Sequence, residues 1–140
     1  MKALAVLAIL LGVIAVLSPR PNLREHDYGS RAIALTYAIY RNAAFSYALK
    51  NKPSGVISSS VLDLPQEWKS LRLWTARMEG GRCYVYGPAS ADEIAAAWKL
   101  FQGSFAVGRA ENGHLTPDGL TPLPAFIPAD NLVSVIEVTP

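Results

Sequence analysis

The chain is poor in the residues that cross-link proteins and in those that build most catalytic centres. Its 140 residues contain one cysteine, Cys83, and two histidines. A single cysteine excludes a disulfide within the chain, and it excludes a metal site built from several cysteines of one chain. Because Cys83 alternates with aromatic residues in a segment that reads as a strand, we expect it to be buried and inert rather than paired with another chain.

Charge is also scarce and nearly balanced, with 13 Lys and Arg against 11 Asp and Glu, a formal net charge of +2. The largest basic group consists of Arg20, Arg24 and Arg31. Glu25 and Asp27 interrupt this group, which we interpret as the flank of a membrane segment. No basic cluster is therefore dense enough to predict binding to nucleic acid.

Recognisable catalytic and metal-binding patterns are absent from the sequence. It has no G-x-S-x-G motif and no P-loop. His26 falls in a polar link and His114 in a turn, and two such histidines among scattered carboxylates do not predict a zinc site. Asp92 and Glu93 are explained by the start of a helix, and Glu137 is expected to face solvent on a strand. We therefore predict a protein that is not an enzyme, with no catalytic residue, cofactor or metal.

What the sequence does have is an apolar N-terminus. Residues 3–17 are 15 apolar residues in a row, preceded by Lys2 and followed by Pro19 and Pro21. As a helix this run is about 22 Å long, whereas a bilayer core needs about 20 residues, so its length favours a cleaved signal peptide. The end of the run favours a retained anchor, because Pro19 would directly follow a cut after Ser18.

These features divide the chain into three parts. Residues 1–18 are expected to be a signal peptide or a signal anchor, residues 19–27 a polar linker, and residues 28–140 a single α+β domain. In either case the domain is expected to lie in the cell envelope on the periplasmic side. We prefer the retained anchor, which would hold the domain at the inner membrane. A buried core helix is disfavoured, because the run has no polar face.

Hydrophobic spacing and turn residues predict the elements of the domain. We expect a helix over residues 28–51, capped by Asp27 or Ser30. The clearest local signal is the capping box of Ser90 and Glu93, which starts a second helix that ends at Gly103. Two helices would then cover one face of a mostly antiparallel sheet, an α+β fold. The strands are expected over residues 71–78, 82–87, 104–110, 114–117 and 132–138, with an Asn-Gly turn between the third and fourth and a proline-rich arm before the last.

Three tyrosines of the first helix form the candidate partner interface. Tyr37, Tyr40 and Tyr47 recur at helical spacing and therefore lie on one stripe. Packing of this stripe against the sheet is the preferred interpretation, with the hydroxyls reaching the edge. The stripe would bind a partner only if its own domain does not cover it.

Four phrases in fixed order resemble a known family. They are YRNAAFSYALKNKP (residues 40–53), LDLP (62–65), CYVYGPASADEIAAA (83–97) and PLPAFIPADNLVSV (122–135). Together with the apolar N-terminus, they resemble the PilM family of small proteins encoded in type IVb thin-pilus operons, including those of conjugative plasmids. The resemblance implies a role in type IV pilus biogenesis at the cell envelope, with other pilus-machinery proteins as partners and the membrane as a further partner if the N-terminal segment is uncleaved. It implies no enzymatic activity and no cofactor, and it supplies no site residues.

Two alternatives stay open. Pilins also join an apolar helix to an α+β head, so a minor pilin-like subunit is one alternative. Pilin processing is not supported, because Gly12 lies inside the apolar run and Leu17, not glutamate, stands five residues later. The other alternative is an exported binding module for cell-wall material or a small ligand. An enclosed aromatic groove would favour the binding module, and a flat exposed apolar patch would favour an assembly component.

Overall fold

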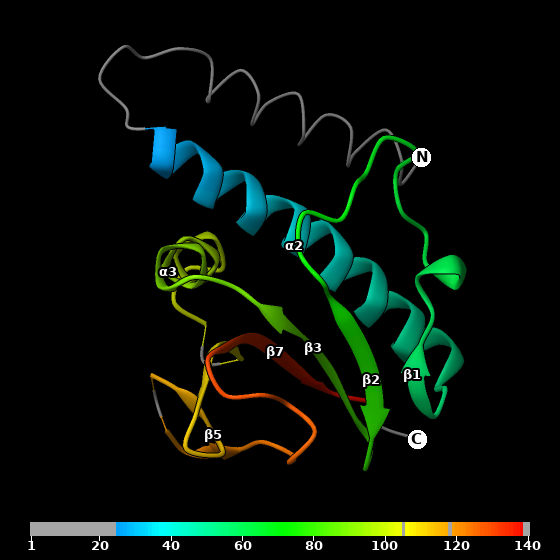
Figure 1. Cartoon of the computed structure of the whole chain (residues 1–140). Coiled ribbons are helices and arrows are strands. Elements are labelled where there is room, and N and C mark those ends of the chain that lie inside the picture. Colours follow the sequence, from blue (N-terminus) through cyan, green and yellow to red (C-terminus); the bar gives the residue numbers. More distant parts are fainter. Residues whose placement is uncertain (1–24, 105, 118, 139–140) are drawn as a thin grey trace.

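Two helices cover one face of a seven-stranded antiparallel sheet (Figure 1). The computed structural model describes residues 25–104, 106–117 and 119–138. The predicted signal or anchor segment (residues 1–18) and most of the predicted linker lie outside these residues. The elements are α2 (Glu25–Asn51), β1 (Gly55–Ile57), the 3-10 turn η1 (Ser59–Val61), β2 (Thr75–Glu79), β3 (Arg82–Pro88), α3 (Ala91–Leu100), β4 (Val107–Glu111), β5 (His114–Thr116), β6 (Thr121–Pro122) and β7 (Asn131–Glu137).

The sheet has the strand order β1-β2-β3-β7-β4-β5-β6, and every neighbouring pair is antiparallel. The last strand of the chain therefore lies at the centre, where Val85 of β3 pairs with Ser134 of β7. This arrangement confirms the predicted α+β class with two helices on a mostly antiparallel sheet. Within the described residues, no helix is both long and apolar enough to cross a membrane.

Helix α2 begins earlier than predicted, at Glu25 rather than at Tyr28. Asp27 and Ser30 lie inside the helix, so neither is its N-cap, and residues 25–27 of the predicted linker are helical. The predicted end is correct. Asn51 closes the last turn by donating from Nδ2 to the Tyr47 carbonyl (3.1 Å), and Lys52 adopts a left-handed conformation (φ 44°).

The main core lies between α2 and the sheet. The Tyr37 side chain is fully buried, and its hydroxyl donates to the Val85 carbonyl (2.9 Å) and shares a hydrogen bond with Ser134 Oγ (2.6 Å). The Tyr37 ring meets Trp74 edge-on at 4.8 Å between centroids. Tyr40 stacks on Trp68 at 5.8 Å. Tyr37 and Tyr40 therefore pack inward, as the preferred interpretation expected, but the Tyr37 hydroxyl lies at the centre of the core and not at its edge.

The opposite face of the sheet has a smaller core. Tyr84 points to this face, whereas Cys83 and Val85 point toward α2, which confirms the predicted alternation of β3. The proline-rich arm before β7 covers the smaller core, and the Phe126 ring lies edge-on to Tyr84 at 5.7 Å. Ile127 is buried beside it. The arm is therefore part of the packed structure and not only a surface link.

The buried thiol of Cys83 gives a first prediction. Burial raises its pKa to about 12, so the unreactive thiol dominates at neutral pH, and the side chain is not accessible. We expect a thiol reagent such as DTNB to label the native protein very slowly and to label one cysteine per chain once urea unfolds it. Rapid labelling in native buffer would contradict the predicted burial.

The start of α3 is held by the predicted capping box. The Glu93 amide donates to Ser90 Oγ (3.2 Å), and the Ser90 amide donates to Glu93 Oε1 (3.1 Å). Arg72, from the segment before β2, adds an ion pair to Glu93 with Nη2 at 2.7 Å from Oε2. The Glu93 side chain is only 8% exposed. This one carboxylate thus fixes α3 and ties the loop before β2 to it.

The carboxylate of Glu93 gives a second prediction. Burial alone would raise its pKa, but hydrogen bonds from Arg72 and Ser90 outweigh this effect and hold the pKa below its usual value. The interaction therefore stabilises the fold above the unfolded pKa of about 4.3, and it is lost as the pH falls through the depressed folded pKa. We expect Glu93→Gln to cost about 1–2 kcal/mol in urea unfolding at pH 7.

The same variant should behave differently in acid. As wild-type Glu93 becomes protonated, the difference in unfolding free energy between wild type and Glu93→Gln should shrink. If the difference in unfolding free energy is the same at pH 7 and in acid, the charge of Glu93 contributes nothing to stability. Glu137 is a suitable control, because its side chain is 74% exposed and its contact with Arg82 is at the surface. Glu137→Gln should change stability by less than about 0.5 kcal/mol.

Candidate functional site

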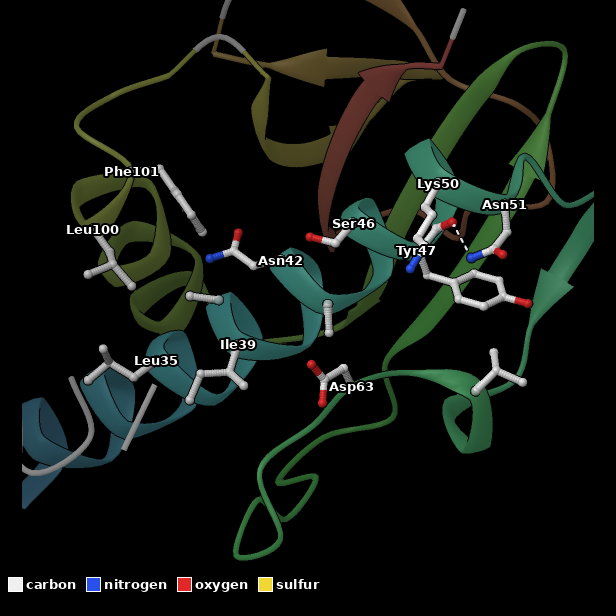
Figure 2. Close-up of a pocket in the computed structure, with 13 residues that line it drawn as sticks. Leu35, Ile39, Asn42, Ser46, Tyr47, Lys50, Asn51, Asp63, Leu100 and Phe101 are labelled. Carbon is white, nitrogen blue, oxygen red and sulfur yellow. Dashed lines mark hydrogen bonds between the residues drawn. The ribbon is translucent and has the colours of Figure 1, made fainter. Parts of the chain in front are cut away.

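An open groove of about 740 Å³ runs along the side of α2 that faces away from the sheet (Figure 2). One wall is the end of α3, and the other is the segment around η1. The lining residues are Leu35, Ala38, Ile39, Asn42, Ala43, Ser46, Tyr47, Lys50 and Asn51 of α2, Val61 and Asp63 of the η1 segment, and Leu100 and Phe101 at the end of α3.

The groove exists because α2 is apolar on two sides. Its inner face is buried against the sheet, yet Leu35, Ala38 and Ile39 of the outer face are also apolar and only partly covered. A surface helix normally carries charged residues on the side that faces solvent. Here no charged residue occurs between Arg31 and Arg41. The outer face is therefore apolar in its N-terminal half, whereas Asn42, Ser46 and Lys50 make its C-terminal half polar.

The two walls extend this apolar surface. Leu100 from α3 is 42% exposed, and Val61 from η1 is 47% exposed. The charged lining residues are Lys50, near the C-terminal end of α2, and Asp63, on the η1 side. The small side chains of Ala38 and Ala43 leave room for close approach along the helix. The groove thus suits an elongated apolar occupant, such as a helix, that keeps its polar groups at the margins.

Arg41 fixes the α3 wall. Its guanidinium lies over the Phe45 ring (4.7 Å to the centroid) and over the Phe101 ring (4.1 Å), and Nη1 donates to Asn42 Oδ1 (3.1 Å). Burial lowers the pKa of Arg41 from its usual value. The cation therefore links α2 to the end of α3 through two aromatic rings, and it holds Phe101 at the edge of the groove.

The structure separates the three candidate interface tyrosines. Tyr37 is 0% exposed and Tyr40 is 3% exposed, so neither can contact a partner in the folded domain. Tyr47 is half-buried and lines the groove. Sequence reasoning followed the aromatic stripe and missed the groove on the other side of the helix. The available signal was a second stripe at spacings of four, three and four residues, formed by Leu35, Ile39, Asn42 and Ser46.

The remaining predicted polar residues do not gather into a site. His114 is exposed, and its Nδ1 is 3.0 Å from the Asn112 carbonyl within the hairpin turn. Glu137 faces solvent, as predicted. Across residues 25–104, 106–117 and 119–138, no group of three or more His, Cys, Asp or Glu side chains could hold a metal ion. The groove therefore offers apolar contact and a few hydrogen-bonding groups.

Comparisons with known proteins agree with this fold. The model of the PilM family matches residues 6–135. Among solved structures, the chain is similar to the crystal structure of a protein designated PilM from Escherichia coli B7A, with a TM-score of 0.60 and 21% sequence identity. The similarity covers 84% of this chain and 99% of that chain. At this identity it supports the fold alone. No curated protein matches the chain.

Proposed function

Because the chain belongs to the PilM family, which indicates a pilus-related role, we propose that it is a non-catalytic component of type IV pilus biogenesis in the cell envelope. The family match over residues 6–135 is the observation that carries this proposal. The pilus in question is the type IVb thin pilus of the kind used in conjugation. The chain acts by contact with other proteins of the pilus machinery.

The proposed location follows from the N-terminal segment. Residues 3–17 have the composition of an export signal, and they directly precede the short link to α2. The proposal places the folded domain on the periplasmic side of the inner membrane. The sequence supports a binding role over catalysis, because it contains no catalytic motif.

The shape of the groove favours an assembly component over a ligand-binding module. A module for sugars or cell-wall material would gain most from an enclosed, aromatic-lined site. The aromatic residues that line this groove are Tyr47 and Phe101, and Figure 2 shows them at different ends. Asn42 and Ser46 lie between them, and Leu35 and Ile39 lie nearer the N-terminal part of α2 on the same open surface. Such a surface suits contact with another polypeptide segment.

Deletion of the gene from its native pilus system tests the proposal. We expect the deletion strain to lose pili, as counted by electron microscopy, and to lose mating in liquid. Supply of the wild-type gene in trans should restore both. Normal piliation and normal liquid mating in the deletion strain would contradict the proposed role.

A further inference from the structure

The arm before β7 covers only part of the sheet face that lies away from the helices (Figure 1). Its Phe126 ring packs on Tyr84 and Tyr86 of β3, with centroids at 5.7 and 5.8 Å. On the neighbouring strands this face is open, and Val56 of β1 is 66% exposed. We refer to the open area beside Phe126 as the ledge, which consists of Val56, Thr75, Arg77 and Tyr86.

Arg77 of β2 lies at the centre of the ledge. Strand pairing places it between Val56 of β1 and Tyr84 of β3. Its guanidinium lies over the Phe126 ring, 4.1 Å from the centroid. The side chain is partly exposed. A guanidinium stacked on a ring in this way keeps the N–H groups of its edge available to a planar acceptor. The fold therefore presents a cation in a fixed position on an otherwise uncharged part of the sheet.

This cation has no acidic partner in the part of the chain that the structure describes. The ion pairs found there join other arginines to carboxylates, and Arg77 is in none of them. Glu79, two residues further along β2 on the same face, is exposed and forms no ion pair with Arg77. The Arg77 Nε is buried and has no hydrogen-bond partner among the described residues. Because a buried donor without a partner destabilises a fold, an apolar side chain would suit the isolated domain better than Arg77.

We propose that the ledge binds an acidic segment of a partner protein, with an Asp or Glu side chain of the partner paired to the Arg77 guanidinium. A carboxylate matches the planar N–H edge of a guanidinium with two hydrogen bonds. Burial raises the pKa of the Tyr86 hydroxyl and the Arg77 cation opposes this rise, so this hydroxyl lies close enough to Arg77 to serve the same ligand.

The surroundings of Arg77 favour a polypeptide over a small anion. A free anion would use the cation alone, whereas Val56 offers apolar contact and β1 is an edge strand of the sheet. Arginine and tyrosine also supply much of the binding energy at protein interfaces. The inference rests on the proposed function only for the source of the partner, which we expect among the pilus-machinery proteins.

Photo-crosslinking of the full-length chain in piliated cells tests the inference. The crosslinker p-benzoyl-L-phenylalanine replaces Val56, an exposed position of an edge strand where a substitution should leave the fold intact. We expect irradiation to give an adduct with another protein, and mass spectrometry to map the attachment beside an Asp or Glu of that protein. The same crosslinker in place of Lys99, which is exposed on α3 on the other side of the sheet, should not give this adduct.

Variants of Arg77 in the chain with the crosslinker at position 56 test the role of the cation. Arg77→Met should lower the adduct yield at least about tenfold. Its urea midpoint should equal or exceed that of the parent chain, since methionine keeps an apolar contact with Phe126 and removes the unpaired donor. Arg77→Lys keeps the charge without the planar edge and should give an intermediate yield. Lys99→Met makes the same change in net charge elsewhere and should leave the yield unchanged.

A charge swap completes the test. Arg77→Glu should abolish the adduct, and replacement of the mapped acidic residue of the partner by arginine should restore it. An adduct yield that neither Arg77→Met nor Arg77→Glu lowers would overturn the inference. So would the absence of any adduct from position 56, an attachment site without an acidic residue beside it, or adducts only between two copies of this chain. The deletion strain can still lose its pili in each of these cases, so failure of the inference is distinct from failure of the proposed function.

Discussion

Replacement of Gly108 by alanine is expected to destabilise the domain by about 3 kcal/mol or more, the upper part of the range for overpacking. Gly108 lies in β4, where a Cβ atom would overlap the carbonyl oxygen of Thr116 in β5 far inside van der Waals contact. The obstructing atom belongs to the backbone, so no side-chain rotation can relieve the overlap. The β4–β5 hairpin must shift, and β4 also pairs with the central strand β7.

Gly29 provides the matched control for Gly108. It lies in α2, and a Cβ atom added there meets nothing within 4 Å. Gly29→Ala is therefore expected to stabilise the domain by about 0.5–1 kcal/mol, because alanine favours the helix. Urea unfolding followed by circular dichroism measures both variants. Similar midpoints for Gly108→Ala and Gly29→Ala would contradict the close approach of β4 and β5.

Replacement of Tyr37 by alanine is expected to have the second large effect, a loss of about 3–5 kcal/mol. Its ring is fully buried between α2 and the sheet and contacts Trp74. The change removes these contacts and leaves a cavity. It also removes the hydroxyl that bonds to Val85 and Ser134. Since small domains are only marginally stable, this loss is a large part of the total.

The variant Tyr37→Phe separates the contribution of the hydroxyl to stability from that of the ring. It keeps the packing but leaves the buried Ser134 hydroxyl without this partner, so we expect a loss of about 1–3 kcal/mol. A double-mutant cycle with Ser134→Ala should give a coupling energy of about 1 kcal/mol between the two hydroxyls. Urea unfolding of the single and double variants measures this coupling. Full additivity of the two changes would contradict the hydrogen bond at the centre of the core.

The sequence predicted the elements whose signals are local. The capping box of Ser90 and Glu93 is made by two side chains three residues apart, and the Asn112-Gly113 turn needs only its own two residues in the left-handed region. Alternation along β3 assigned Cys83 and Tyr84 to opposite faces of the sheet. These features do not depend on distant parts of the chain, and the structure contains all of them.

The features that sequence reasoning missed depend on tertiary contacts. β1 spans three residues beside a serine-rich stretch, and pairing with β2 alone defines it. Residues 71–74 were predicted as strand but precede β2, and Arg72 instead bonds to Glu93. Trp98 of α3 is 39% exposed and lies over Gly103 at the helix end, a contact that also depends on the folded turn after α3.

The groove was not predicted from the sequence, for a related reason. Because α2 carries no charged residue between Arg31 and Arg41, the sequence of this part does not indicate which face the sheet will cover. The interface was predicted at the aromatic residues of α2, among them Tyr37 and Tyr40. These two side chains are buried in the folded domain. The aliphatic stripe of Leu35 and Ile39 became a candidate surface only once the sheet, α3 and η1 were in place.

The central claim is that this chain works in contact with the pilus machinery in the envelope. The most direct test is chemical cross-linking of piliated cells, followed by purification of the tagged full-length chain and mass spectrometry of the captured proteins. Our account predicts that subunits of the pilus machinery are enriched over a tagged control protein of the same envelope fraction. Recovery of no pilus subunit above that control, from cells that carry normal pili, would contradict it.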